Sequence, residues 1–445
     1  MKKRETHAAI ISLGCSKNLV DAECMARILT DNEIQMVSDP GAAEVIIVNT
    51  CGFIESAKKE AIDTILEMTE YKSHGVCDFL IVTGCLAQRY GREMELELPE
   101  VDAILGTGSY QDIGDTVLRL YGISDGAHRD PAPLGHIRAD RIVTTRGYAW
   151  MKIAEGCLHR CAFCAIPFIR GKYRSRPVEE LLEEARTLSE NGFSEIILIA
   201  QDTTSYGVDL YGRRMLPELL RALSAIENVR LFRIMYMYMD GITDELIGEI
   251  AANPKIAKYV DIPIQHGDDG ILRAMRRSDT SARIRQTISR IRAAIPDIIL
   301  RTTVLVGFPG ETEDAFRNLL DLLEDMRFDR LGAFVFSAEE GTAAFSMESQ
   351  VPNDLAQRRL DELMLFQQSI SLQKNEERVG RIFDVSIEST SEDGVFYRGR
   401  SYGEAPEVDP TVYVVAPLAP LEMGQVVPVR IIDCSEYDLV GEALS

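Results

Sequence analysis

The chain has 445 residues, of which 46% are hydrophobic and 27% charged, which suggests about three domains and excludes a disordered chain or a disulfide-stapled miniprotein. Lys and Arg total 48 against 70 Asp and Glu, a net charge of −22, so nucleic acid is a poor default partner and a basic partner is favoured. No apolar run approaches the ~18 residues of a membrane span, and we expect a soluble, cytoplasmic protein without a membrane partner.

Three short apolar runs open the chain, and each is followed by a helix-like segment rich in Ala, Glu and Leu. They occupy residues 8–13, 45–50 and 79–84. This alternation predicts a parallel sheet built from β-α-β units. The stretch 121–141 contains Gly and Pro without periodicity and reads as a linker. We therefore expect a first domain at 1–125 and a linker at 126–142.

The alternation resumes at Tyr148 and continues through a second domain, expected at 143–378. Strands are predicted at 150–156, 195–200, 230–236, 259–264, 298–307 and 331–336, and helices at 177–191, 214–226, 243–252, 280–294 and 311–326. Six β/α units fit a partial barrel related to the eightfold one. A long amphipathic stretch at 354–378 ends this domain.

Five short alternating segments follow Gly380. They lie at 381–388, 394–401, 411–417, 425–433 and 439–444. The pattern predicts a small antiparallel β-barrel, similar to an oligonucleotide-binding fold, at 379–445. The expected fold class is thus α/β with a C-terminal β-barrel.

Three of the nine cysteines form a C-x3-C-x2-C loop directly after the first barrel strand: Cys157, Cys161 and Cys164. In a reducing compartment such cysteines are better metal ligands than disulfides. Three thiolates can hold a four-iron, four-sulfur (4Fe-4S) cluster and leave one iron open to a small molecule. A structural zinc site is the alternative. It would need a fourth ligand, and His159 is a poor one because it lies inside the loop with little freedom to turn inward.

A second set of cysteines, Cys15, Cys51 and Cys85, follows the three N-terminal strands one by one. The carboxyl ends of parallel strands open on one edge of a sheet, so these thiols should converge on a second metal site. Burial as small hydrophobic residues is the alternative. The other cysteines, Cys24, Cys77 and Cys434, are assigned to packing.

Further candidates lie at strand ends of the central domain. Gln201 and Asp202 face the mouth of the predicted barrel, where each could bind a cofactor or only cap the next turn. Gly307 and Gly310 allow close approach of the backbone to a ligand, or only a tight turn. His266 reads as a structural histidine. No set of residues points to a catalytic acid, base or nucleophile.

The loop GCLHRCAFC resembles the signature of the radical S-adenosylmethionine enzymes. The resemblance implies that Cys157, Cys161 and Cys164 ligate a cluster whose open iron is chelated by S-adenosylmethionine. It also implies a 5′-deoxyadenosyl radical that abstracts hydrogen from an unactivated C–H bond, with the protein supplying placement and exclusion of solvent.

Two cysteine sets and a terminal barrel resemble the methylthiotransferases, in which the first set binds a second 4Fe-4S cluster and the barrel, called a TRAM domain, recognises the substrate. Motifs such as ISLGCSKNLVDAE, VNTCGFIESAKKEAI and LIAQDTTSYGVDLYG resemble the ribosomal-protein branch, called RimO. This branch implies methylthiolation of the β-carbon of an aspartate in protein twelve of the small ribosomal subunit. It also implies two S-adenosylmethionine per turnover, as methyl donor and radical source, and a flavodoxin- or ferredoxin-like electron donor.

The charge of the C-terminal barrel separates the branches. Residues 381–445 hold four arginines and no lysine against twelve carboxylates. A barrel that bound tRNA would need clustered Lys and Arg, so the sequence favours docking of a basic ribosomal protein. A merely solvated acidic surface is the alternative. The alternatives are a tRNA adenosine methylthiotransferase and a non-catalytic iron–sulfur protein that binds the ribosome.

Overall fold

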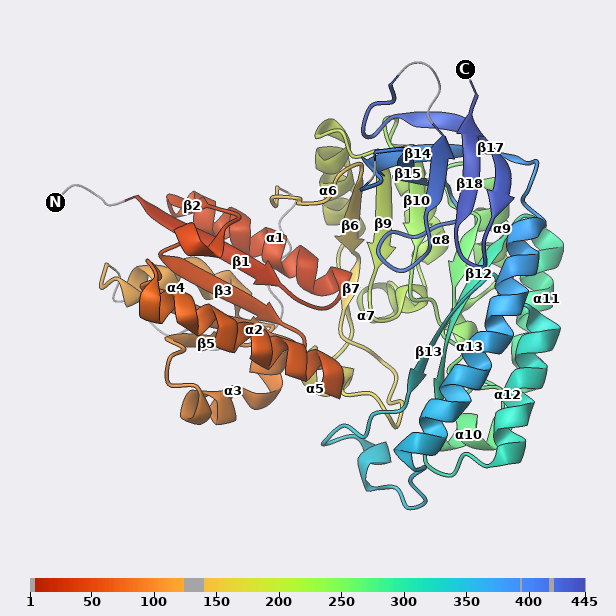
Figure 1. The fold of residues 1–445 in the computed structure, drawn as a ribbon, viewed down its shortest axis with the longest axis horizontal. Helices are drawn as coiled ribbons and strands as arrows, with labels where there is room; N and C mark the ends of the chain where they lie inside the picture. Colours follow the sequence, from red (N-terminus) through yellow and green to blue (C-terminus); the bar gives the residue numbers. More distant parts are fainter. Residues whose placement is uncertain (1–4, 124–139, 393, 416–419, 445) are drawn as a thin grey trace.

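The computed structural model describes residues 5–123, 140–392, 394–415 and 420–444. They form an N-terminal α/β part, a central α/β part and a C-terminal β-barrel (Figure 1). This order confirms the expected fold class. The expected linker at 126–142 lies almost wholly outside the described residues, so the domain boundaries stay predictions.

The N-terminal sheet has five parallel strands in the order β2-β1-β3-β4-β5. The strands are β1 (Thr6–Ser12), β2 (Ile34–Met36), β3 (Val45–Thr50), β4 (Phe79–Gly84) and β5 (Ala103–Leu105). The helices are α1 (Ser16–Asp31), α2 (Glu55–His74), α3 (Cys85–Glu97) and α4 (Ile113–Leu120). The three predicted strands are confirmed as β1, β3 and β4. The edge strands β2 and β5 were not predicted, because three residues are too few to show a period.

Helices cover both faces of this sheet, which explains its uninterrupted apolar strands. Ile46 and Val48 of β3 pack with the core of α2 and α3, whereas Val45 and Ile47 pack with that of α1 and α4. Successive side chains of a strand point to opposite faces, so one short run fills both layers. Because the side chains within the strands fill both apolar layers, residues that bind a ligand are expected at the strand ends.

The central part contains six parallel strands in two sheets, β10-β9-β6 and β11-β12-β13. These are β6 (Tyr148–Lys152), β9 (Glu195–Ile199), β10 (Leu231–Ile234), β11 (Tyr259–Asp261), β12 (Ile299–Val306) and β13 (Arg330–Val335). A short hairpin of β7 (Ala154–Glu155) and β8 (Arg174–Ser175) lies beside them. All six predicted strands are confirmed.

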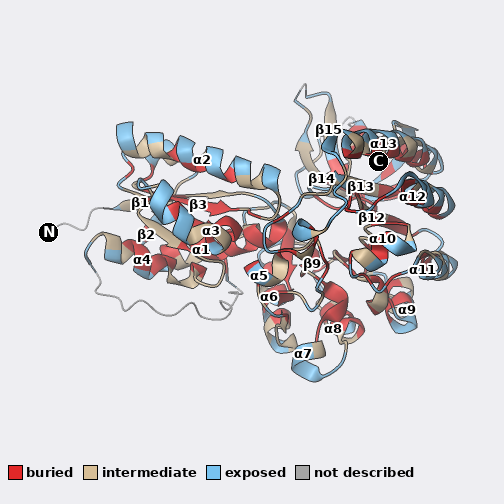
Figure 2. Cartoon of the chain, turned by 90° about the horizontal axis from the view of Figure 1, so that it is seen from below, coloured by how far each residue is buried: buried red, intermediate tan, exposed pale blue. Residues whose placement is uncertain are grey.

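Helices surround these strands, with their exposed residues on the outside (Figure 2). They are α6 (Val178–Glu190), α8 (Leu216–Ser224), α9 (Asp244–Ala252), α11 (Ser281–Ala294), α12 (Glu313–Met326) and α13 (Asn353–Glu376), with short turns α5 (Ile166–Ile169), α7 (Val208–Tyr211) and α10 (Asp269–Ala274). In α12, the Thr312 hydroxyl caps the N-terminus by accepting from the Ala315 backbone N–H. Its buried residues, including Phe316, Leu319 and Leu323, recur at helical spacing.

The C-terminal barrel is closed, in the order β14-β15-β16-β18-β17. Its strands are β14 (Ile382–Thr390), β15 (Phe396–Arg400), β16 (Val412–Val415), β17 (Val426–Cys434) and β18 (Leu439–Ala443). The predicted five-stranded barrel is confirmed. It is mixed rather than wholly antiparallel, because β16 and β18 pair in parallel.

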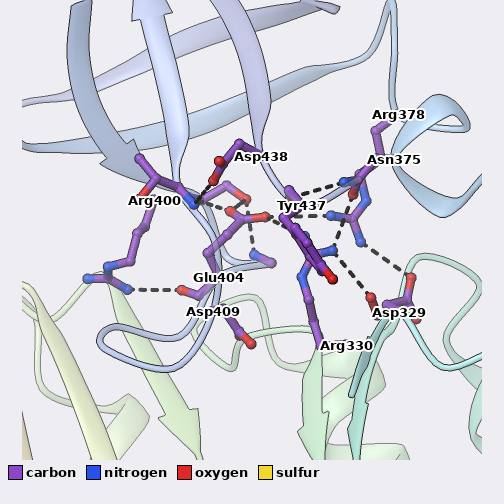
Figure 3. A network of polar contacts seen from close by, with 12 residues as sticks. Asp329, Arg330, Asn375, Arg378, Arg400, Glu404, Asp409, Tyr437 and Asp438 are labelled. Atoms are coloured by element: carbon purple, nitrogen blue, oxygen red, sulfur yellow. Dashed lines mark hydrogen bonds and ion pairs between the residues drawn. The ribbon is translucent and has the colours of Figure 1, made fainter. Parts of the chain in front are cut away.

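The C-terminal barrel sits on the end of the central part at which the strands begin (Figure 1). The Arg233 guanidinium donates to the Tyr402 carbonyl at 2.7 Å, and the Tyr259 hydroxyl donates to Asp409 at 2.6 Å. Figure 3 shows a further part of this contact around Arg330. The opposite end, at which the strands finish, is therefore not covered by this barrel. We call that end the mouth.

In the part of the chain that the structure describes, no helix is both long and apolar enough to cross a membrane.

Candidate functional site

The three N-terminal cysteines lie at the carboxyl ends of neighbouring parallel strands. Cys15 precedes α1 in the turn after β1, Cys51 directly follows β3, and Cys85 begins α3 after β4. The turn before Cys15 needs glycine: Gly14 has a φ of +88°, and a Cβ there would lie 2.7 Å from the Cβ of Cys51. The turn next to Cys15 thus packs directly against the side chain of Cys51.

Electrostatics also places these thiols together. Burial, together with the charges of Cys85 and Cys15, raises the pKa of Cys51 to about 11. Desolvation would also raise the pKa of Cys15, but the positive charges of Lys17 and Arg170 outweigh it, so this pKa is lowered. Thiolate is the metal-binding form, so nearby cations favour ligation at this set.

The second set lies in the loop after β6, at the mouth of the central part. Burial, together with the charge of Cys161, raises the pKa of Cys157 to about 12. Burial and the charge of Cys161 likewise raise the pKa of Cys164. The charge of Cys161 thus acts on both other thiols of the loop, and their role as ligands of one cluster stays a prediction.

An aromatic stack beyond the end of β10 supports this loop. The Tyr238 hydroxyl lies 3.0 Å from the Cys161 sulfur, and the His159 ring stacks on the Tyr238 ring with centroids 3.7 Å apart. Arg277 covers the same tyrosine ring, 4.2 Å from its centroid. His159 also hydrogen-bonds Asp202 through Nε2 at 2.8 Å, which turns it away from ligation.

The donor set fits a cluster at both places, because each offers three thiols, and thiolates are the usual protein ligands of iron–sulfur clusters. Among the described residues, no three Cys, His, Asp or Glu side chains are grouped to hold a single metal ion. A 4Fe-4S cluster binds each thiolate to a different iron, so its ligands stand farther apart than those of one ion.

The structure separates the two candidates at the end of β9. Asp202 is fully buried, and its carboxylate accepts from Thr204, Ser205 and His159. These bonds favour the capping alternative. Gln201 instead donates from Nε2 to Glu155 at 2.6 Å, and its buried Oε1 accepts no hydrogen bond from the residues that the structure describes. Gln201 therefore keeps a free acceptor.

Gly307 and His266 have structural reasons for their positions. Gly307 has a φ of +77°, a Cβ there would lie 2.4 Å from the Cβ of Ala356, and its N–H donates to Glu311 at 2.9 Å. His266 is buried, with one ring nitrogen 3.3 Å from Glu311 and the other accepting from the Asp268 N–H. Gly310 has a φ of +84° and open space around its Cβ position.

A buried group of charges between the two cysteine sets was not predicted. It comprises Asp21, Lys152, Glu155 and Arg170, and we call it the interdomain charge cluster. Lys152 pairs with Asp21 at 2.5 Å and with Glu155 at 2.7 Å. Arg170 pairs with the same two carboxylates at 2.6 and 3.2 Å. Burial would raise the pKa of Glu155, but Lys152 and Arg170 lower it to about 2.

The interdomain charge cluster reaches the N-terminal cysteines through Arg170. One guanidinium nitrogen lies 3.6 Å from the Cys85 sulfur and also bonds the Asn18 side chain. Glu155 reaches toward the other set, since it lies two residues before Cys157 and holds Gln201. The signal in the sequence was that Lys152 and Glu155 lie in an otherwise apolar predicted strand, which does not reveal Asp21 and Arg170 as their partners.

Three family descriptions match successive parts of the chain. Residues 7–106 match the uncharacterized protein family UPF0004, residues 151–323 the Radical SAM superfamily, and residues 379–444 the TRAM domain. The Radical SAM match implies a 4Fe-4S cluster and S-adenosylmethionine.

Curated relatives align with nearly the whole chain. Ribosomal protein uS12 methylthiotransferase RimO of Acetivibrio thermocellus is 46% identical over 100% of this chain and 99% of its own length. The protein of the same name from Clostridioides difficile is 48% identical over 98% of each chain. The chain belongs to the RimO methylthiotransferase family. The RimO family consists of transferases, and the expected ribosomal-protein branch is confirmed.

Solved structures share the fold of this RimO-family chain at low identity. A radical S-adenosylmethionine methyltransferase, TsrM from Kitasatospora setae, has a TM-score of 0.56 at 12% identity, covering 85% of this chain and 80% of that one. The cobalamin-dependent enzyme OxsB has a TM-score of 0.52 at 13% identity, covering 82% of this chain and 56% of that one. These likenesses concern the fold alone.

Proposed function

We propose that this chain methylthiolates ribosomal protein uS12, at the β-carbon of an aspartate, and uses two S-adenosylmethionine per turnover. The observation that carries the proposal is that two three-cysteine sets lie on either side of one buried charge cluster. The full-length relatives named as uS12 methylthiotransferases support the choice of substrate.

In this proposal each cysteine set holds one 4Fe-4S cluster. Cys15, Cys51 and Cys85 would hold the cluster that receives the sulfur, and Cys157, Cys161 and Cys164 the cluster that binds S-adenosylmethionine. When bound, these groups supply a radical that removes hydrogen from carbon, and the sulfur and methyl group that replace it.

The chain's own residues position these groups and exclude water. Asp21 of α1 and Glu155 of β7 share the cations of Lys152 and Arg170, which ties the N-terminal part to the central part. A fixed distance between the two cysteine sets favours reaction between the groups that they would hold, and a closed site keeps a reactive substrate away from solvent.

Of the predicted cofactor-binding residues, Gln201 has the best support, because its Oε1 is a buried acceptor without a partner in the described part of the chain. An unsatisfied buried oxygen is costly and can be satisfied by an N–H or O–H of a bound molecule. For Asp202 and Gly307, a contact with the cofactor stays a prediction.

The acidic C-terminal barrel is proposed to dock the basic substrate. Not all of its carboxylates are available to a substrate, because the side chains of Glu404 and Asp409 are buried and paired with arginines of the central part. Because the barrel covers the end opposite the mouth, it would bind a part of uS12 distant from the modified residue. We further propose a flavodoxin- or ferredoxin-like donor, and action in the cytoplasm, where ribosomes are assembled.

The test is an anaerobic reaction of the reconstituted holoenzyme with purified uS12, S-adenosylmethionine and a reductant. We expect mass spectrometry to find one added methylthio group on an aspartate, with 5′-deoxyadenosine released. A parallel reaction contains tRNA. Modified adenosine with unmodified uS12 would establish the tRNA activity instead, and intact clusters without 5′-deoxyadenosine would establish a non-catalytic protein.

A further inference from the structure

A groove of about 900 Å³ opens between the N-terminal and central parts. One wall consists of the first turns of α2, the second of α3, and the third of the segment 338–345 that follows β13 (Figure 1). None of its lining residues is a cysteine or belongs to the interdomain charge cluster. The groove is therefore distinct from the site described above.

All three walls are attached to the elements that carry the cysteines. α2 starts four residues after Cys51, and α3 starts at Cys85. The third wall bonds directly to the other cysteine loop, because the Ala344 N–H donates to the Ala162 carbonyl at 2.8 Å. A molecule in the groove would thus lie beside both cysteine loops at once.

Arg89 fixes the walls relative to one another. Its guanidinium donates at 2.8 Å to the carbonyl of Gly52, next to Cys51, and pairs at 2.9 Å with Glu339. Lys58 of α2 pairs with the same buried carboxylate at 3.2 Å. Two cations on one buried carboxylate hold the groove in shape without a ligand, as preorganised binding sites require.

The lining combines exposed apolar side chains with an excess of carboxylates. Ile62 is 41% exposed and Phe345 49% exposed. Among the described residues, five carboxylates line the groove against two lysines, and one of these lysines, Lys58, pairs at 2.6 Å with one of the five, Glu55. The carboxylates are Glu55, Asp63, Glu93, Glu97 and Glu340. Such a surface repels nucleic acid phosphates and attracts a segment that carries basic and apolar side chains.

We propose that this groove binds the segment of uS12 that flanks the modified aspartate. The inference rests on the proposed function. A ribosomal protein is basic because it binds RNA phosphates, so its charge complements the four carboxylates that Lys58 does not pair with: Asp63, Glu93, Glu97 and Glu340. The C-terminal barrel lies at the other end of the central part, and the groove supplies the local contact beside the cysteine loops that the barrel cannot make.

The first test reverses charge at the groove in the double variant Asp63→Lys/Glu97→Lys. The matched control, Glu183→Lys/Glu190→Lys, makes the same charge change on exposed positions of α6. We expect KM for uS12 to rise about tenfold in the groove variant only, and to depend less on salt. Iron content and the 5′-deoxyadenosine formed without uS12 should stay unchanged. An equal KM in both variants would overturn the inference.

The second test does not depend on turnover. The photoreactive amino acid p-benzoylphenylalanine is placed at position 62, or at position 210 of α7, where Leu210 is similarly exposed. We expect the holoenzyme to crosslink to uS12 from position 62 and not from position 210. No crosslink to uS12 from position 62, or a crosslink to a second copy of this chain instead, overturns the inference. If the unaltered enzyme fails to modify uS12 but crosslinks to it, the proposed function fails and the groove stands.

Discussion

At the scale of single residues, each cysteine set is proposed to bind its own cluster, and Cys51 provides the most direct test. We expect Cys51→Ala to lower the iron bound per chain from about eight to about four, because the set at 157–164 keeps its cluster. Iron analysis and absorption spectra of the reconstituted protein measure this. Cys434→Ala is the control, since Cys434 lies in the C-terminal barrel, and it should keep all the iron. Unchanged iron in Cys51→Ala would remove the second cluster from the proposal.

Arg170 is the residue on which the interdomain charge cluster most depends. Its side chain is 3% exposed, and Arg170→Gln would leave Asp21 and Glu155 to share Lys152 alone. Removing one partner of a buried ion pair costs about 3–5 kcal/mol, so we expect a large drop in the urea concentration at which the metal-free protein unfolds. The metal-free protein is used so that loss of a cluster does not contribute.

An exposed pair provides the comparison for Arg170. Arg317 is 66% exposed and pairs with Glu313 one turn away on α12. Such pairs contribute about 0.3–0.5 kcal/mol, so Arg317→Gln should barely move the unfolding midpoint. Equal midpoints for the two variants would show that the interdomain charge cluster adds no stability.

At the scale of elements, the close packing of α13 on the end of β12 is set by Gly307. Gly307→Ala adds a Cβ 2.4 Å from the Cβ of Ala356, on a backbone with φ of +77°. Gly310→Ala meets the same kind of backbone strain, with φ of +84°, but open space. Strain alone costs about 1–2 kcal/mol, and a forced overlap costs about 1–3 kcal/mol more.

We therefore expect Gly307→Ala to lower the thermal midpoint clearly more than Gly310→Ala does. Calorimetry of both variants measures the difference. Similar midpoints would mean that α13 shifts to accept the added carbon at little cost.

At the scale of the whole molecule, buried ion pairs attach the C-terminal barrel to the central part. One of them, at Glu195, should make the free energy of unfolding depend on pH. Burial would raise its pKa, but Arg400 and Arg233, at 3.0 and 2.9 Å, lower it to about 2. A carboxylate with a lowered pKa stabilises the fold above about pH 4.3, and this stability is lost as the pH falls toward 2.

Glu195→Gln should accordingly be less stable at pH 7 and lose less stability on acidification. Between pH 4 and pH 3 its free energy of unfolding should fall less steeply, by up to about 1.4 kcal/mol per pH unit. Urea unfolding across this range measures the slope. Glu324→Gln, on the exposed face of α12, should keep the slope of the unaltered protein. A parallel loss in both variants would contradict the role of Glu195.

The sequence alone determined the helices and strands closely, as α12 and the five strands of the C-terminal barrel show. It also determined that two sets of three cysteines follow parallel strands. Both results depend on local information: hydrophobic periodicity, caps and spacing are properties of neighbouring residues. The short strands β2 and β5 were not predicted, because three residues are too few to show hydrophobic periodicity.

Only the tertiary structure decided which charges meet. Asp21 and Lys152 are 131 residues apart, and Arg400 and Glu195 are 205 apart, yet each pair is buried in contact. Nothing local distinguishes these residues from charges on the surface, because their pairing depends on how the three parts pack. The same packing placed the C-terminal barrel at the end opposite the mouth and formed the groove between α2, α3 and the segment after β13. The cysteines were thus evident in the sequence, and what surrounds them was decided by the fold.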